Sequence, residues 1–175
     1  MEGHALNGSA DAPFSLRPLD AGDLDAVCAI EAAARPWTAR WPRDAYLGPP
    51  GSGRCAWVAV RAGSIAGFVL TGEAAGEVEI LNLAVAESAR RTGVGEALVG
   101  AALNAAAARG ATRAFLEVRV SNAAAIAFYA ALRFEEAGRR RGYYSDPQED
   151  ALLLALPLAA GPLLPSGDPP PTVDT

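Results

Sequence analysis

Apolar residues in the first third of the chain recur at spacings that predict one strand and two helices. Residues 14–17 read as a short strand, and Asp20 can cap a helix whose apolar positions recur every three or four residues. Pro36 ends this helix, because the residue before a proline is disfavoured in helical geometry. A second short helix is expected within 38–47, before the turn-rich segment 48–53.

The next segments read as strands, and one of them changes phase. The apolar runs 55–61 and 65–71 are joined by three small residues, which predicts an antiparallel hairpin. Within 77–85 the apolar alternation moves from even to odd positions at Leu81. A β-bulge at Leu81 or Asn82 would restore the inward face. A strand buried on both faces fits the same pattern equally well.

The second half of the chain alternates helices with strands. An Ala-rich helix is expected over 93–109, ended by Gly110. Ser121 can cap a further helix that runs to residue 131. Three strands accompany these helices: 113–120, 134–141 and 151–156. A meander followed by helix, strand, helix and hairpin predicts a mixed α/β sheet.

The 175 residues, of which 51% are hydrophobic and 20% charged, suit one folded domain. Residues 1–12 are small and polar, and residues 158–175 are rich in proline, so both ends are expected to be disordered. The folded domain is therefore expected over 13–157.

Charge and rare residues exclude several classes of function. A net charge of −5, with arginine as the only strong base, leaves no footprint for nucleic acid. The single histidine, His4, leaves little material for a Ser-His-Asp triad or a His-ligated metal, so no metal is expected. Cys28 and Cys55 match no ligand spacing and are interpreted as buried small hydrophobes. The longest apolar run, 151–164, is broken by prolines and too short for a membrane span, so we expect a cytoplasmic protein.

A glycine-containing loop, residues 90–95, connects a strand to the longest expected helix. Backbone N–H groups at a helix N-terminus are unpaired and carry the positive end of the helix dipole, so this loop could hold a phosphate without lysine. Gly93 and Gly95 would let the backbone approach the anion. The loop lacks the endings of a nucleotide triphosphatase or dinucleotide loop. Glycines that serve only the turn are the alternative interpretation.

Two further candidates lie on the strand 113–120 and on the helix after it. Glu117 stands near the carboxyl end of the strand, where open α/β sheets bind ligands; an exposed ion pair is the alternative. Residues seven apart nearly superimpose on a helix, so Asn122 and Tyr129 share a face. We expect both to point toward the strand that bears Glu117, while a half-buried tyrosine with a solvated hydroxyl also fits.

Together these features resemble the GNAT superfamily of acetyl-CoA-dependent N-acetyltransferases. The superfamily resemblance rests on the slipped strand, the Arg-x-x-Gly-x-Gly loop, and Leu116-Glu117-Val118-Arg119 followed by 121–129. A closer resemblance, to the ribosomal-protein alanine N-acetyltransferases (RimI type), rests on Ile30-Glu31, Pro36-Trp37, Leu83-Ala84-Val85, Tyr143-Tyr144 and 149–151. It covers residues 14–157 and implies the GNAT fold: a mixed α+β sheet of six to seven mostly antiparallel strands, with about four helices and a bulged central strand.

The resemblance implies roles for particular residues. Glu117 would be the general base, and Tyr129 the general acid that protonates the departing thiolate. Asn122 would contact acetyl-CoA from the wall opposite the bulged strand. The pantetheine arm would bind the backbone of Leu83, Ala84 and Val85. The pyrophosphate would bind main-chain N–H groups of Arg91, Thr92, Gly93, Val94, Gly95 and Glu96. The acceptor groove would be lined by Trp37, Tyr143 and Tyr144, which also fit as packing residues.

The resemblance also implies the reaction: direct transfer of acetyl, in a ternary complex, to the α-amine of an N-terminal alanine of a small-subunit ribosomal protein. An α-amine with a pKa of about 7.7–8 is partly neutral near pH 7.5, whereas a lysine near 10.4 is neutral about one time in a thousand. An acidic enzyme suits a basic ribosomal protein. A small-molecule amine, such as an antibiotic or polyamine, is the alternative acceptor, and a non-catalytic CoA-binding module is a third interpretation.

Three residues depart from the family pattern. Arg133 replaces the glycine that usually ends the tyrosine helix, and in a left-handed conformation it would cost about 1 kcal/mol. Gly142 stands where an asparagine commonly precedes the tyrosine pair, and Arg35 stands where an aromatic residue often precedes Pro-Trp. Both flank the expected acceptor groove. The arginine run 139–141 is interpreted as a solvated strand with alternating faces.

Overall fold

A computed structural model describes residues 14–34, 41–49 and 51–158. Residues 1–12, 159–175, Arg35 and Trp37 therefore lie outside the described residues, whereas Leu158, expected in the disordered tail, is buried in the core. The strands are β1 (Ser15–Pro18), β2 (Arg54–Arg61), β3 (Ser64–Ala74), β4 (Glu77–Val85), β5 (Arg113–Arg119), β6 (Glu135–Ser145) and β7 (Gln148–Pro157). The α-helices are α1 (Leu24–Ala34), α2 (Val94–Ala108) and α3 (Ala123–Ala131), and the short 3-10 helices are η1 (Ala21–Asp23), η2 (Arg43–Tyr46) and η3 (Glu87–Ala89).

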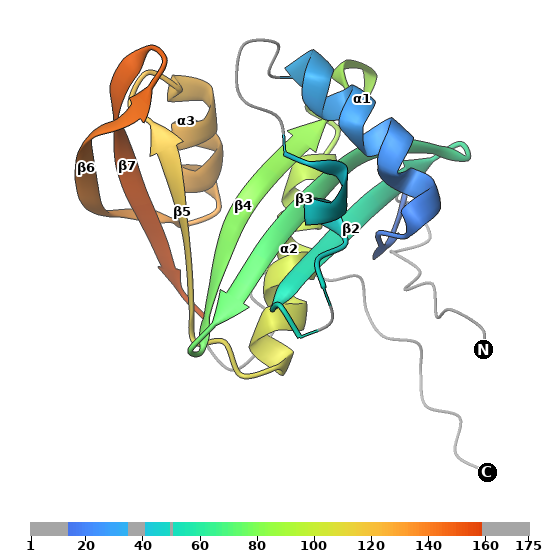
Figure 1. The fold of residues 1–175 in the computed structure, drawn as a ribbon, viewed down its shortest axis with the longest axis horizontal. Helices are drawn as coiled ribbons and strands as arrows, with labels where there is room; N and C mark the ends of the chain where they lie inside the picture. The colour runs from blue at the N-terminus through green and yellow to red at the C-terminus, as the bar shows by residue number, and fades with distance from the viewer. Residues whose placement is uncertain (1–13, 35–40, 50, 159–175) are drawn as a thin grey trace.

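The strands form one sheet in the order β1-β2-β3-β4-β5-β7-β6. Neighbouring strands are antiparallel except β4 and β5, which run parallel. This parallel ladder is short: it begins at Glu77 opposite Arg113 and ends at Glu79 opposite Phe115. Beyond it the two strands diverge, which separates a lobe of β1–β4 from a lobe of β5–β7 (Figure 1). The expected mixed, mostly antiparallel sheet is confirmed.

Helices cover both faces of the first lobe, with α1 in front of the sheet and α2 behind it (Figure 1). Leu98 and Leu103 lie on the apolar stripe of α2 and are fully buried against one face. On the opposite face, Val27 of α1 packs with Tyr46 of η2 and Phe68 of β3. The core therefore consists of two layers, separated by the sheet.

The central strand β4 contains the expected bulge. Asn82 pairs with Leu70 of β3 and Ile80 pairs with Thr71, so Leu81 is an extra residue without a partner on β3. The extra residue reverses the alternation, so Ile80 and Leu83 both pack against the core under α2. Leu81 packs into the core under α1. The prediction of a bulge is confirmed, and the strand also contributes to the core on both faces.

The described helices are three α-helices and three short 3-10 helices, and the short helix expected within 38–47 is found as the 3-10 turn η2. Two local expectations were wrong. Asn122, not Ser121, caps α3: its Oδ1 accepts a hydrogen bond from the Ala125 N–H at 3.1 Å. Cys28 and Cys55 are free but only half-buried.

None of the helices in the described part of the chain has the length and apolar character that a membrane span needs.

Candidate active site

Glu117 lies just beyond the point where β4 and β5 separate. The last paired residues are Glu79 and Phe115, and Glu117 follows two positions later on the same face of β5. Its side chain is 11% exposed, so the carboxylate is largely withdrawn from water. A carboxylate in such a position needs partners that compensate for its charge.

Three side chains surround this carboxylate. The Arg140 guanidinium forms an ion pair with Glu117, with Nε 2.7 Å from Oε1. Hydrogen bonding to Glu117, together with burial and the negative charge of Glu117, raises the pKa of Tyr143 to about 12. Burial and the charge of Glu117 raise the pKa of Glu79, while the positive charge of Arg140 acts in the opposite direction. The site therefore holds two neighbouring carboxylates and one guanidinium.

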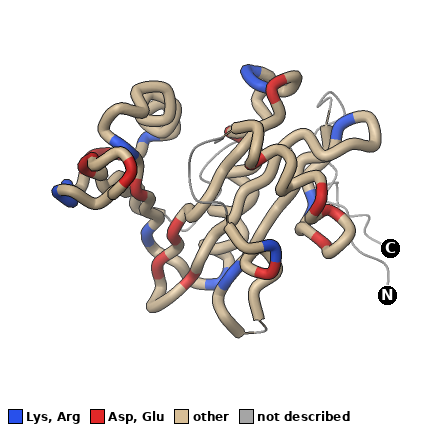
Figure 2. The backbone as a smooth tube through the Cα atoms, turned by 45° about the horizontal axis from the view of Figure 1, so that its top comes forward, with Lys and Arg blue, Asp and Glu red and all other residues tan. Residues whose placement is uncertain are grey.

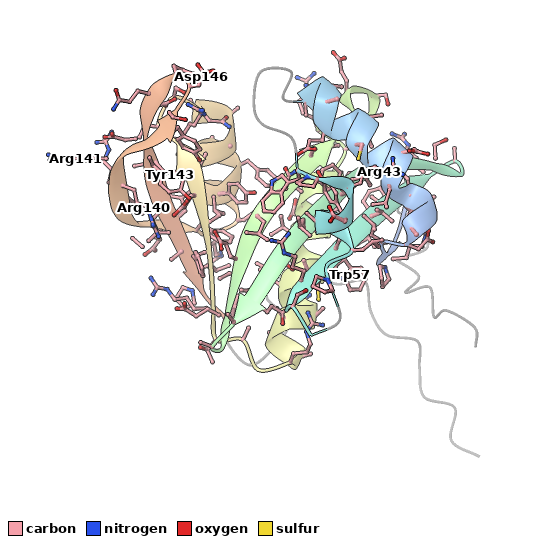
Figure 3. The ribbon with its side chains drawn as sticks, viewed as in Figure 1. Arg43, Trp57, Arg140, Arg141, Tyr143 and Asp146 are labelled. Carbon is pink, nitrogen blue, oxygen red and sulfur yellow. The ribbon has the colours of Figure 1, made fainter. Side chains whose placement is uncertain are left out.

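A bulge in β6 brings Arg140 and Tyr143 to the same side. Arg140 pairs with Ala151 and Tyr144 with Glu149, so the β6 segment is two residues longer than its partner. In a regular strand, residues 140 and 143 would face opposite sides. In Figure 3, Arg140 and Tyr143 lie over β5 and β6, whereas Arg141 extends away from the molecule. Residues 139–141 are all exposed, as the interpretation of a solvated strand requires. Arg140 lies on the face that bears Glu117, because it pairs with Ala151, which shares a face of β7 with Leu153, the partner of Glu117.

Gly142 makes this bulge possible. It has φ 60°, in the left-handed region, and its N–H donates to Asp150 Oδ1 at 2.8 Å. Glycine and asparagine are the residues that adopt this conformation most readily. Glycine, in place of the asparagine that is common in the family at this position, therefore preserves the left-handed backbone conformation. Arg133, with φ 66°, does adopt the left-handed conformation considered for it.

We call the region between β4 and β5 beyond Glu79 and Phe115, where the two strands separate, the opening. On its β4 side, or wall, the strand presents main-chain groups. Beyond Glu79, the edge of β4 that faces β5 pairs with no strand among the described residues. Peptide groups of Leu83, Ala84 and Val85 lie along this stretch, while the other edge of β4 pairs with β3. The Val85 carbonyl accepts a bond from Arg90 Nε at 3.4 Å. This wall can therefore offer backbone donors and acceptors to an extended ligand.

The start of α2 fits an anion. Gly93 is its N-cap, with φ 82°, and no side chain caps the first N–H groups of the helix. A Cβ on Gly93 would meet nothing within 4 Å, so the Cα of this N-cap residue faces open space. Gly95, in contrast, lies against the ring of Phe128, where a Cβ would come to 3.4 Å. Uncapped N–H groups at a helix start are what a pyrophosphate requires, so this loop fits acetyl-CoA.

The other residues of this loop differ in exposure. Thr92 Oγ1 donates to the Ala89 carbonyl at 2.7 Å, which closes the turn. Val94 is fully buried and anchors the helix in the core. The remaining side chains of the stretch, Arg91 and Glu96, are exposed.

The structure places Asn122 and Tyr129 in different surroundings. Asn122 is exposed at the first turn of α3, where its side-chain oxygen caps the helix. Tyr129 is 7% exposed, and its ring is edge-on to those of Phe128 and Phe134, at 5.0 and 5.4 Å between ring centres. The ring therefore belongs to the core between α3 and the sheet. Tyr144 lies under the Arg119 guanidinium, 4.1 Å from its ring centre.

A buried polar cluster beside the β4 bulge was missed by the sequence analysis. Asn82 Nδ2 donates to Glu31 Oε1 at 2.8 Å and to the Tyr46 hydroxyl at 3.3 Å. Glu31 and Asn82 are 3% and 1% exposed. Burial, followed by hydrogen bonding to Glu31, raises the pKa of Tyr46. The available signal was Asn82 itself, a polar residue directly after the phase change of an apolar strand.

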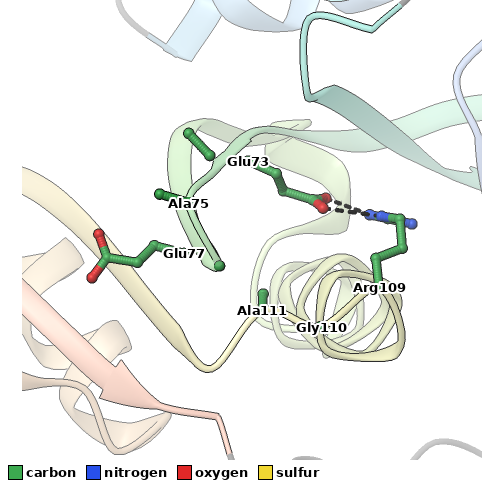
Figure 4. Close-up of a pocket in the computed structure, with 8 residues that line it drawn as sticks. Glu73, Ala75, Glu77, Arg109, Gly110 and Ala111 are labelled. Atoms are coloured by element: carbon green, nitrogen blue, oxygen red, sulfur yellow. Dashed lines mark hydrogen bonds and ion pairs between the residues drawn. The ribbon is translucent and has the colours of Figure 1, made fainter.

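Other surface features lie away from Glu117. A small hollow between the β3–β4 turn and the end of α2 is lined by Glu73 and Arg109, which form an ion pair (Figure 4). It lies beside Glu77, the first residue of β4, four residues before the bulge at Leu81. Basic and acidic residues are interspersed in both lobes (Figure 2).

A splayed parallel pair, a bulged strand and an uncapped helix start together define a GNAT-type acyltransferase fold. The acetyltransferase (GNAT) family matches residues 24–134, and the chain belongs to this family.

The chain is 35% identical over 147 residues to the [ribosomal protein bS18]-alanine N-acetyltransferase of Escherichia coli K12, covering 83% of this chain and 98% of that protein. The crystal structure of the ribosomal-protein-S18-alanine N-acetyltransferase from E. coli superposes with a TM-score of 0.71 at 35% identity, over 82% of this chain and 93% of that one. Ard1 from Thermoplasma volcanium gives a TM-score of 0.73 at 29% identity, over 84% and 99%. The protein is therefore an acetyl-CoA-dependent N-acetyltransferase.

Proposed function

We propose that this protein acetylates the α-amine of an N-terminal alanine of a small-subunit ribosomal protein, in a ternary complex with acetyl-CoA. The observation that carries the proposal is the 35% identity to the E. coli [ribosomal protein bS18]-alanine N-acetyltransferase, across 98% of that enzyme. The net charge of −5 supports it, because ribosomal proteins are basic and opposite charges favour encounter.

In this proposal the two walls of the opening divide the work of binding. The uncapped N–H groups of residues 91–96 hold the pyrophosphate, and the free edge at 83–85 holds the pantetheine arm. Asn122 contacts acetyl-CoA from the side of α3. The acceptor N-terminus enters beside Tyr143 and Tyr144. Acetyl-CoA supplies the thioester carbonyl that the amine attacks.

Glu117 and Tyr129 carry the proton transfers. Glu117 accepts the proton that the acceptor nitrogen loses, directly or through one water. As the C–N bond forms and the C–S bond breaks, Tyr129 gives a proton to the thiolate sulfur, and exchange with solvent restores both groups. A positioned carboxylate base contributes a factor of about 10² to 10⁴ in rate. A partly neutral α-amine requires no stronger base.

The test is a comparison of Glu117→Gln with a matched carboxylate. We expect E117Q to lower kcat/KM for a peptide with a free N-terminal alanine by about 10²- to 10⁴-fold, measured as CoA thiol release and by mass spectrometry of the peptide. Glu136→Gln, at an exposed position on β6, should leave kcat/KM unchanged.

Two results would contradict the proposal. Full activity of E117Q would reject Glu117 as the base. Turnover of small amines such as spermidine, with none of the peptide, would reject the protein acceptor in favour of a small-molecule one. The same peptide with a blocked N-terminus and an internal lysine shows whether the α-amine is the acceptor.

A further inference from the structure

We infer that Arg140 is a positioning residue that fixes the Glu117 carboxylate at the mouth of the opening between β4 and β5. The inference rests on the proposed role of Glu117 as base. No role was expected for Arg140 from the sequence, and its place in the site follows from the register of β6 on β7, which puts it on the same face of the sheet as Glu117.

The first argument is the reach of the side chain. Arg140 comes from β6 and Glu117 from β5, and β7 lies between the two strands. Adjacent strands are about 4.8 Å apart, so the guanidinium crosses about 10 Å to place Nε 2.7 Å from Glu117 Oε1. Arg140 is 58% exposed at its side chain, yet its donor meets a carboxylate that is 11% exposed. The long, largely exposed side chain of Arg140 therefore reaches a carboxylate that is largely buried.

The second argument is that the backbone beneath Arg140 is held in place. Asp150 of β7 accepts the Gly142 N–H on Oδ1 and pairs with Arg139 Nε on Oδ2, at 2.8 and 3.0 Å. The Arg140 guanidinium also lies over the Tyr143 ring, 5.5 Å from its centre. The bulge is thus pinned on both sides of Arg140, which reduces the conformational freedom lost when its side chain binds Glu117.

The third argument is electrostatic. Glu79 of β4 and Glu117 of β5 lie on either side of the point where the two strands separate, and their negative charges repel each other. Arg140 is the cation that acts on both carboxylates, and Tyr143 is the remaining titratable group that faces Glu117. Without the guanidinium, repulsion from Glu79 would turn the Glu117 side chain away from the acceptor. A displacement of about 1 Å at a reacting group can cost about 10²-fold in rate.

The experiment compares the same substitution at two adjacent arginines. Arg140→Met should lower kcat about 10- to 100-fold, with KM for the peptide and Kd for acetyl-CoA unchanged. Arg140→Lys keeps a cation within reach and should retain most of the activity. Arg141→Met is the matched control, because Arg141 is exposed and forms no ion pair with any residue that the structure describes. It should behave as wild type.

A double variant shows whether Arg140 acts through Glu117. E117Q/R140M should be no slower than E117Q alone, since a residue that only positions the base has no effect once the base is removed. Equal activity of R140M and R141M, a loss confined to KM, or a further loss on top of E117Q would each overturn the inference. If E117Q is fully active, the proposed base itself fails. If E117Q is inactive and R140M is normal, only the inference on Arg140 fails.

Discussion

Two bulged strands, β4 and β6, reach the site from opposite sides and are held in opposite ways. The bulge of β4 is buried, and Asn82 beside it is bound to Glu31 of α1 out of reach of water. The bulge of β6 is exposed, and Asp150 holds it through a backbone N–H and an arginine. The β4 side of the opening offers main-chain groups, and the β6 side offers side chains. A strand that presents its backbone can be fixed from inside the core, whereas one that presents side chains must be fixed at the surface.

The largest expected effect is at the buried bulge. Asn82→Ala removes the amide donor and leaves the Glu31 carboxylate buried without it, which should lower the free energy of unfolding by about 3 kcal/mol. Urea unfolding measures this value. Asn122→Ala is the matched control: it removes an exposed helix cap and should cost about 1 kcal/mol. If both variants lose the same stability, burial of the Asn82 hydrogen bond does not add to its contribution.

The exposed bulge should respond to backbone strain. Gly142→Ala places a Cβ on a residue with φ 60° and should cost about 1 kcal/mol, seen as a lower Tm. Gly142→Asn should cost less, because asparagine tolerates this conformation. Gly138→Ala, in the same strand, lies outside the positive-φ region, and its Cβ would meet Leu153 at 4.0 Å. A loss at residue 138 as large as that at 142 would show that conformation is not what the bulge requires.

The smallest effect is a pH dependence near the β6–β7 turn. Hydrogen bonds from Ser121, and then the charge of Arg119, lower the pKa of Glu149. Because this carboxyl is more acidic in the folded chain, it stabilises the fold above its ordinary value of 4.5, and this contribution is lost as the pH falls below that value.

Glu149→Gln should therefore give a slightly lower Tm than wild type near neutral pH, and the difference should shrink on acidification through that window. Thermal unfolding across the pH series provides the measurement. Glu136→Gln, on the exposed face of β6, should show no such trend. A difference in Tm that stays constant with pH would mean that ionisation of Glu149 does not contribute to the turn.

The sequence predicted the bulge in β4 and missed the one at 140–144 in β6, for a physical reason. In β4 an extra residue at Leu81 shifts the parity of apolar side chains, so the bulge leaves a visible trace in the sequence. β6 is polar and exposed over most of its length, so an insertion shifts nothing that burial would reveal. The contact of Arg140 with Glu117 depends on the pairing of β5 and β6 with opposite edges of β7, and no local sequence pattern reveals that pairing.

Long-range contacts account for the other misses. Glu31 and Asn82 are 51 residues apart, and no local pattern links them. Ser121 and Asn122 are both good caps, and the choice follows from Glu149, which accepts the Ser121 N–H at 2.6 Å from a distant strand. The loop at the start of α2, in contrast, is local in sequence and was located correctly as the connection into the longest helix.

The position of β6 at the end of the sheet has a consequence for the protein in a crowded solution. An edge strand of 11 residues offers a row of peptide groups on which another chain could add a strand. Register breaks at 136–138 and 140–144 interrupt that row, and the three arginines at 139–141 place like charges beside any incoming strand. The strand that supplies side chains to the opening thus also protects the protein from edge-to-edge aggregation.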